Sequence, residues 1–434
     1  MNSPYIRTPE VNPYERVSEF QLFELVWRWS LYGGLALLPF MMWRFHPDIQ
    51  LTFSDGFFVI ALAFALFTGR LNVNFFGGVT PLWILAILLM LAGLGASSFV
   101  NGDPIRFGIV SSQYLFAYLI LPLVILLPRP QEQLPLIAIY VATVVAIEAF
   151  SIAMFYLNSG NPSGTDWINH NFVTGAERLG SFFGSANRNA AFVSLTVPFV
   201  LYLARAGIWP LWATIPSMLV LGLAILLTAS VTGLTSSLLA IALFVFAAYG
   251  KHAWKVVVVC VGVVSLLWAS GFTLPETFQE RVLGAAESGD ISEAGTYTGR
   301  MALVEEAIKL SDEVGFLGLG ADQFRAVSDE EAPVHNVYLL IWTEGGPFSL
   351  LGWLLAMGIF AWIGLRSFAT DRAAGALVLA VGVAFLIISN ASTHIYARMW
   401  VIPVLFAMQA GVLCLQREKR QYPQSPAAEV HAIA

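Results

Sequence analysis

The chain has 434 residues, of which 57% are hydrophobic and 12% charged, with a net charge of −6 and a mean hydropathy of +0.72. A soluble protein this apolar could not cover its surface with polar groups, so the composition excludes an ordinary soluble domain and predicts residence in a membrane. The two cysteines, Cys260 and Cys414, both lie in apolar runs, which argues against a disulfide framework and against a zinc site.

The predicted elements are membrane-spanning helices, which need about 20 apolar residues each. Residues 1–24 are polar and lack the apolar core of a removable signal peptide, so they are predicted to form a cytoplasmic segment. Twelve spans follow, which predicts an all-α polytopic membrane protein with nine spans in 25–270 and three in 337–416. They lie near 25–43, 55–69, 81–100, 107–127, 134–157, 189–204, 211–229, 233–250, 253–270, 338–365, 374–390 and 398–416.

Lysine and arginine positions predict how the spans are oriented. With a cytoplasmic N-terminus, 13 of the 22 basic residues lie on inside segments that are mostly short, as the positive-inside rule requires. Both termini, including the tail 417–434, are therefore expected in the cytoplasm. The loop 271–336, which holds 13 of the 28 acidic residues, is expected to face outward. A second outer loop, 158–188, is rich in Gly, Asn and Ser, as is typical of an irregular ligand-facing segment.

Several arginines are predicted at the outer face, where the positive-inside rule expects few. Arg178 and Arg188 bracket LGSFFGSAN, and Arg300 opens an amphipathic helix predicted to lie along the outer interface. Arg325 follows the turn GFLGLGADQF, and Arg398 begins the last span. Each alone could snorkel or pair with a carboxylate of the loop. As a group they predict a site for a phosphorylated, lipid-linked ligand, because arginine grips phosphate bidentately.

His335 lies where the acidic sequence SDEEAP meets an apolar span. An imidazole accepts a proton near neutral pH, and the adjoining carboxylates are expected to orient it and raise its basicity. The simpler interpretation is a histidine at a helix cap, with Asn336 as an ordinary cap residue. His170 and His394 are the other outer candidates for a base. No His or carboxylate cluster has metal-site spacing, so neither a metal nor another cofactor is expected.

Two other motifs have simple interpretations. GFLGLG lacks the strand and helix context of a dinucleotide site, so a turn is predicted there. TASVTGLTSS, residues 228–237, offers hydroxyl groups for hydrogen bonds between neighbouring helices.

Three of these stretches, taken together, resemble a known signature. TGRMALVEEAIKL, GFLGLGADQF and VHNVYLLIWTEGG follow the order of the C-terminal signature of the bacterial O-antigen ligase and O-antigen polymerase superfamily. RLGSFFGSANRNAAF is similar to an upstream stretch of the same family. The resemblance runs from 178 to 349, and the layout of twelve spans with one large periplasmic loop agrees along the whole chain.

The resemblance implies a GT-C-like glycosyltransferase of the bacterial inner membrane, with amphipathic helices in a periplasmic loop that carries the active site. The family transfers a glycan from undecaprenyl diphosphate to an acceptor hydroxyl. The acceptor is lipid A-core for ligases of lipopolysaccharide biosynthesis and a lipid-linked repeat unit for polymerases of O-antigen, capsule or exopolysaccharide. The resemblance makes His335 the general base and places Arg300, with Arg178 or Arg188, on the diphosphate. It also implies an inverting, metal-independent reaction.

Six further residues are assigned supporting roles around these groups: Asn336, Tyr338, Glu344, Gly346, Arg325 and Arg398. The chain departs from the family pattern at two positions. Ser349 follows Gly346 where ligases often carry Gly, Thr or Tyr, which leaves ligase versus polymerase open. Val231 occupies a turn where many relatives carry an arginine, so that cationic contact is either absent or supplied by Arg188 or Arg398.

The prediction is therefore a ligase that joins a glycan to lipid A-core, with a polymerase as the alternative within the same chemistry. A transporter or flippase without chemistry is the alternative of a different class. It predicts charges at mid-membrane depth, where Glu148 is the main example in this chain. The expected partners are the lipid-linked donor, the acceptor and the bilayer, with no nucleic acid and the oligomeric state left open.

Overall fold

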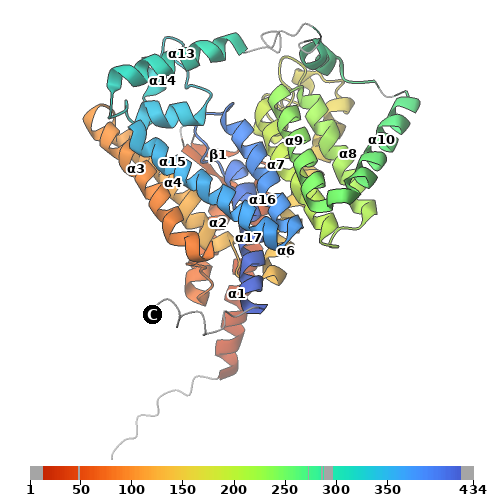
Figure 1. Cartoon of the computed structure of the whole chain (residues 1–434), viewed down its shortest axis with the longest axis horizontal. Helices are drawn as coiled ribbons and strands as arrows, with labels where there is room; N and C mark the ends of the chain where they lie inside the picture. The colour runs from red at the N-terminus through yellow and green to blue at the C-terminus, as the bar shows by residue number, and fades with distance from the viewer. Residues whose placement is uncertain (1–12, 47–48, 272, 285–286, 288–296, 422–434) are drawn as a thin grey trace, which may run out of the picture.

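The computed structural model describes residues 13–46, 49–271, 273–284, 287 and 297–421, and these form a bundle of helices (Figure 1). Residues 1–12 and 422–434 of the two predicted terminal segments lie outside the described residues. So do 272, 285–286 and 288–296 of the predicted outer loop.

Helices make up most of the described chain. The first half contains α1 (Pro13–Ala36), β1 (Arg44–His46), β2 (Ile49–Thr52), α2 (Phe53–Thr68), η1 (Gly77–Val79), α3 (Thr80–Val100), α4 (Pro104–Leu115), η2 (Phe116–Ile120), α5 (Leu121–Ile125), α6 (Pro130–Leu157), η3 (Pro162–Gly164), η4 (Ser181–Phe183) and α7 (Ala186–Arg205). The second half contains α8 (Leu211–Thr228), α9 (Val231–Tyr249), η5 (Gly250–His252), α10 (Ala253–Ala269), α11 (Glu276–Phe278), η6 (Gln279–Leu283), α13 (Tyr297–Val314), α14 (Phe324–Val327), α15 (Val337–Thr370), α16 (Arg372–Ser389) and α17 (Arg398–Gln421).

The polytopic all-α architecture predicted from hydropathy is confirmed. Eight helical segments of the described residues are long and apolar enough to cross a membrane. They are Gly77–Val100, Pro104–Ile125, Pro130–Leu157, Leu211–Thr228, Val231–Gly262, Val337–Thr370, Arg372–Ser389 and Arg398–Glu418. Each of the twelve predicted spans overlaps a helix, but α1, α2 and α7 are not among these eight segments, and Val231–Gly262 joins α9 to the first part of α10.

The first predicted span was wrong at its boundaries. The helix begins at Pro13 and ends at Ala36, and the residues predicted to continue it to 43 instead form turns that lead into β1. β1 and β2 pair antiparallel, with Arg44 opposite Thr52. This small hairpin was not indicated by the sequence, because apolar residues continue through the helix end and mask it.

The bundle has two distinct ends (Figure 1). α13 and α14 lie at one end, above α3 and α15, and the start of α1 and the end of α17 lie at the opposite end. We call the end with α13 and α14 the loop end. The second predicted outer loop reaches the same end, because Asn187 at the start of α7 lines a cavity together with Arg300 of α13.

A break in α15 shapes the loop end. Gly346 has φ 70° and ψ −175°, so the helix is interrupted there. A break of this kind removes intrahelical donors from the carbonyl groups of the preceding turn. Two of these carbonyl groups accept hydrogen bonds from the GFLGLG segment instead. The N–H of Leu319 donates to the carbonyl of Thr343 at 2.9 Å, and the N–H of Gly320 donates to the carbonyl of Glu344 at 2.8 Å.

The same segment is also attached to α3. The N–H of Gly318 donates to Ser97 Oγ at 3.0 Å, and the N–H of Ala321 donates to Ser98 Oγ at 2.8 Å. Glycine is required at 318, because an added Cβ would collide with the backbone of Glu344. The predicted turn at GFLGLG is therefore confirmed, and the structure places it between α3 and the break in α15.

Gly346→Ala should destabilise the protein, because alanine is strained at this positive φ and its Cβ would lie 2.5 Å from the Phe316 carbonyl oxygen. We expect a loss of about 1–3 kcal/mol, measured as a lower thermal unfolding midpoint of the purified protein. Gly358→Ala in the same helix is the matched control. A Cβ there meets nothing within 4 Å, so helix propensity should leave stability equal or higher. Equal midpoints for wild type and Gly346→Ala would contradict the required break.

Candidate active site

Arg178 is held at the start of α7 by two hydrogen bonds. Its Nε donates to the carbonyl of Thr228 at 2.7 Å, and a terminal nitrogen donates to Asn187 Oδ1 at 2.8 Å. These bonds join the outer loop to the end of α8 and leave part of the guanidinium for another partner.

Thr228 belongs to the TASVTGLTSS segment, which was predicted to form hydroxyl contacts between helices. One such contact is present, because the hydroxyl of Ser237 in α9 donates to that of Ser194 in α7 at 2.8 Å.

Arg300 lies in the first turn of α13. The face of this helix that packs on the bundle contains Leu303 and Ala307, and its Ser311 hydroxyl lies 2.8 Å from that of Thr343 in α15. The helix is therefore fixed to the N-terminal part of α15. Arg300 is half-buried, and its Nε is buried without a hydrogen-bond partner among the described residues.

His335 directly precedes the cap of α15. The neighbouring Val334 is fully buried in a cluster with Leu303 and Phe324, which anchors the segment below α13. His335 itself is half-buried, and its Nδ1 is buried with no hydrogen-bond partner in the described part of the chain. Packing of the adjoining segment and a backbone hydrogen bond with Pro333 therefore position the imidazole, while Nδ1 remains without a partner.

A cavity of about 330 Å³ brings these elements together. It is lined by Asn187, Gly299, Arg300, Leu303, Glu330, Ala332 and His335. The cavity thus joins the two loops that the sequence predicts to face outward, although the residues come from positions more than a hundred apart along the chain.

The surroundings of His335 lower its pKa, whereas the sequence predicted that the adjoining carboxylates would raise it. Burial lowers its pKa from the usual 6.5, and the charges of Arg300 and then Arg188 lower it further. The carboxylates of Asp329, Glu330 and Glu331 are exposed, so water screens them. The imidazole is consequently neutral at pH 7, which is the form that can accept a proton.

The arginines near the cavity form a positively charged region. Burial, followed by the charges of Arg281 and Arg300, lowers the pKa of Arg178 to about 10, which still leaves it protonated at neutral pH. Arg188 lies close enough to Arg44 for the two charges to repel. Within the part of the chain that the structure describes, no ion pair joins Arg178, Arg188 or Arg300 to a carboxylate. Such a region attracts anions.

Two of the predicted supporting residues belong to the start of α15. Asn336 caps the helix, with its Oδ1 accepting from the N–H groups of Tyr338 and Leu339 at 3.0 and 3.1 Å. Its Nδ2 donates to Asn390 Oδ1 at 3.1 Å. Tyr338 packs against the core with its hydroxyl buried. The cap interpretation of Asn336 therefore holds, and through it the residue fixes the helix start beside His335.

Glu344 lies in a buried polar cluster near the break in α15. Its carboxylate accepts from the N–H groups of Asp322 and Phe324 at 2.8 and 3.3 Å. His394 Nε2 lies 3.2 Å from Glu344 Oε2 without forming a hydrogen bond, and its Nδ1 lies 3.1 Å from the Tyr114 hydroxyl. Glu344 therefore anchors the turn that precedes α14.

Donor atoms of Asp322, Glu344 and His394 lie within 4.8 Å of one another, a grouping that the sequence spacing did not indicate. Asp322 already pairs with Arg106 and, at 3.0 Å, with Arg325, and these guanidinium groups would repel a cation. Arg325, another predicted supporting residue, is thus engaged with a carboxylate.

Arg398 is committed to a structural role. It is 4% exposed, and its guanidinium forms an ion pair with Asp55. One of its terminal nitrogens also donates to the carbonyl of Tyr396 at 3.0 Å, and the group lies 4.8 Å from the Phe116 ring centroid. Unlike Arg178, Arg188 and Arg300, Arg398 is therefore paired with a carboxylate.

Three residues of the site were missed by sequence reasoning. Asn187 both lines the cavity and binds Arg178, and its position beside Arg188 in SANRN was the signal that could have found it. Arg44 and Arg281 were counted among the outer basic residues, but their proximity to Arg188 and Arg178 depends on tertiary packing.

Residues 216–355 match the family model described as O-antigen ligase. The matched region contains Arg300 and His335 but begins after α7, which carries Asn187 and Arg188. No curated protein matches the chain.

The pKa of His335 should lie below 6.5, and Arg300→Gln should raise it, because the positive charge that opposes protonation is removed. The measurement is an NMR titration of histidine-labelled protein, with the signal assigned by its loss in His335→Gln. Arg325→Gln is the control, since Arg325 is paired with Asp322 and should leave the value unchanged. A pKa of His335 at or above 6.5 would count against this environment.

Arg398→Met should destabilise the fold by about 3–5 kcal/mol, because it leaves Asp55 as a buried charge without its partner. The double variant Asp55→Asn/Arg398→Met should recover much of this loss, since asparagine can keep accepting from the N–H of Thr52 as Asp55 does at 2.7 Å. Thermal unfolding of the four proteins in the cycle measures both effects. A double variant as unstable as the sum of the single variants would exclude the coupling.

Proposed function

We propose that this chain, a member of the O-antigen ligase and polymerase superfamily, transfers a glycan from undecaprenyl diphosphate to an acceptor hydroxyl at the loop end of the bundle. The superfamily supports glycan transfer by a membrane protein in general. The observation that carries the proposal is a cavity lined by a neutral histidine and a half-buried arginine, beside further arginines without carboxylate partners among the described residues.

The arginines would bind the diphosphate. Arg300 has a buried donor without a partner at the cavity, and Arg178 is held by Thr228 and Asn187 with donors to spare. Arg188 adds a third charge near His335. When the bond from the sugar to the diphosphate breaks, negative charge develops on the leaving oxygen, and fixed guanidinium groups stabilise it without reorganisation.

His335 would activate the acceptor. The acceptor oxygen forms the new bond to the anomeric carbon, the electron pair of the old bond leaves with the diphosphate, and the hydroxyl proton passes to the imidazole. Because its pKa is lowered, His335 is in the unprotonated form needed for this step at neutral pH. Attack opposite the leaving group inverts the anomeric centre.

We assign the loop end to the periplasm and both termini to the cytoplasm of a bacterial inner membrane. The distribution of lysine and arginine supports this orientation, and a periplasmic cavity fits a carrier lipid whose diphosphate lies at the membrane surface.

Lipid A-core is the acceptor that we propose. A second carrier-linked repeat unit, as used by a polymerase, is the alternative, and Ser349 does not discriminate, since its hydroxyl simply bonds to the Met90 carbonyl of α3 at 2.8 Å.

The test is transfer by the purified chain in nanodiscs, using glycan linked to undecaprenyl diphosphate with or without lipid A-core. We expect His335→Ala and Arg300→Ala each to reduce turnover by about 10²–10³-fold while both proteins stay folded. Matched controls are His170→Ala, whose side chain is 83% exposed, and Arg325→Ala. Product on lipid A-core identifies a ligase, and chain growth without it identifies a polymerase.

Turnover should persist in excess EDTA, because arginines provide the positive charge in this mechanism. The grouping of Asp322, Glu344 and His394 makes this measurement informative, since a divalent-metal requirement would point to that cluster and overturn the arginine mechanism. Intact, bound donor without product under any of these conditions would favour the transporter hypothesis.

A further inference from the structure

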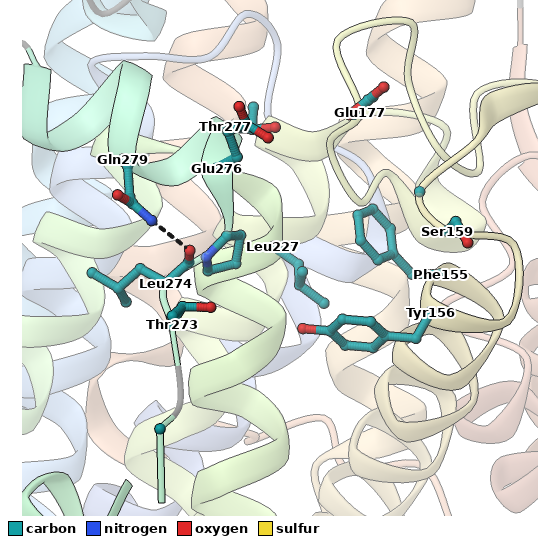
Figure 2. A pocket seen from close by; sticks show the side chains of 13 residues that line it. Phe155, Tyr156, Ser159, Glu177, Leu227, Thr273, Leu274, Glu276, Thr277 and Gln279 are labelled. Carbon is teal, nitrogen blue, oxygen red and sulfur yellow. Dashed lines mark hydrogen bonds between the residues drawn. The ribbon is translucent and has the colours of Figure 1, made fainter. Parts of the chain in front are cut away.

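A larger cavity, of about 780 Å³, lies beside the proposed site at the loop end, between the end of α6 and the segment that follows α10. Figure 2 shows Phe155, Tyr156 and Ser159 on one side, Thr273, Leu274 and Gln279 on the other, and Leu227 between them. Glu177, Glu276 and Thr277 lie at the upper edge in this view. We call this cavity the side pocket.

The side pocket has the chemistry that recognises a saccharide. Phe155 and Tyr156 offer aromatic rings to the apolar faces of sugar rings, and Leu227 is a buried apolar floor. Around them stand groups that bond to hydroxyls, among them the carboxylate of Glu177 and the amide of Gln279. The Gln279 amide is already oriented, because its Nε2 donates to the Leu274 carbonyl at 2.8 Å, which leaves its oxygen as an acceptor.

The charge of the side pocket limits the class of saccharide that it can bind. Glu177 and Glu276 contribute two carboxylates, while no lysine or arginine is among its described lining residues. An anionic sugar would be repelled there, in contrast to the arginine region beside it. The volume falls within the range of small-molecule sites and accommodates a few sugar units.

The two walls of the side pocket lead directly to the arginines. Glu177 is followed by Arg178, whose side chain bonds to Thr228, the residue after Leu227 in the floor. On the other wall, Gln279 precedes Arg281 by two positions in η6, and Arg281 is near enough to Arg178 for their charges to interact. A diphosphate held by Arg178 would therefore place an attached glycan at the entrance of the pocket.

We propose that the side pocket binds neutral saccharide units of the glycan substrate. This inference rests on the proposed function for the identity of the ligand, but saccharide binding itself is measurable without any transfer. The saccharide belongs to the donor or to the acceptor, and the two share the same chemistry of ring faces and hydroxyls.

The first experiment is saturation-transfer NMR on the full chain in nanodiscs, with maltotetraose, mannotetraose and chitotetraose as neutral probes and tetragalacturonate as the anionic comparison. We expect at least one neutral probe to bind, and tetragalacturonate not to bind. Tyr156→Ala should weaken binding by about tenfold, and Glu177→Gln should weaken it in the same direction. No binding of any neutral probe, or equal binding of the anionic one, overturns the proposal.

Matched controls separate the pocket from general surface effects. Trp167→Ala removes an aromatic side chain that is 74% exposed on the same outer loop but outside the pocket, and Glu280→Gln removes a carboxylate next to Gln279. Both should bind as wild type does. If they weaken binding as much as Tyr156→Ala and Glu177→Gln do, the side pocket is not the site.

Two further experiments show whether the saccharide belongs to the donor or to the acceptor, and they separate this inference from the proposed function. In the transfer assay, Tyr156→Ala should raise KM for the donor if the pocket holds the donor glycan, or KM for the acceptor if it holds the acceptor, with kcat little changed. His335→Ala should keep full probe binding. Saccharide binding without any transfer by wild type would contradict the proposed function alone, and transfer with an unchanged KM in Tyr156→Ala would contradict this inference alone.

Discussion

The loop end of this protein depends on a single interruption of a helix. Gly346 takes a left-handed φ of 70°, and the carbonyl groups of Thr343 and Glu344 accept from the turn at 318–320 instead of from their own helix. An unsatisfied buried carbonyl costs about 1–3 kcal/mol, so the break and the turn stabilise each other. Because the turn also bonds to Ser97 and Ser98, it holds α13 and the segment before α15 against the bundle. Arg300 and His335 lie on those two elements.

The second constraint is how the acidic residues of the loop are used. Glu306 accepts from Ser328 and Asp329, Asp322 pairs with Arg106 and Arg325, and Glu344 accepts from backbone N–H groups. These carboxylates hold the loop together, and those of the run before His335 are exposed, with Glu330 at the cavity. A loop rich in acidic residues therefore carries a cavity that lies beside arginines with no carboxylate partner among the described residues. This arrangement suits an anionic group at the cavity and a neutral saccharide in the adjoining side pocket, where carboxylates line the wall.

Much of the candidate site could be inferred from local sequence. Arg300 lies at the start of an amphipathic helix and His335 follows that helix in the same predicted loop, and their position at one cavity agrees with the motif that singled them out. The basicity of His335 was inferred in the wrong direction, because burial and the charge of Arg300 have a larger effect on its pKa than the exposed carboxylates that precede it. Arg398 is the clearest case of a residue whose role was hidden: its partner Asp55 lies 343 positions away. The small hairpin before α2 was hidden for a similar reason, since apolar composition does not distinguish a strand from a helix end.

The sequence by itself determined the class of this protein, the order of its helices and the turn at GFLGLG. These follow from hydropathy over about 20 residues and from local glycine chemistry, both of which are properties of a short window. The tertiary structure decided which charges are neutralised and which remain available. Arg106 and Asp322 are 216 positions apart, and Arg178 meets Arg281 and Arg300 across two loops. Coulomb interactions depend on distance in space and on burial, and neither is written into the spacing of residues along the chain.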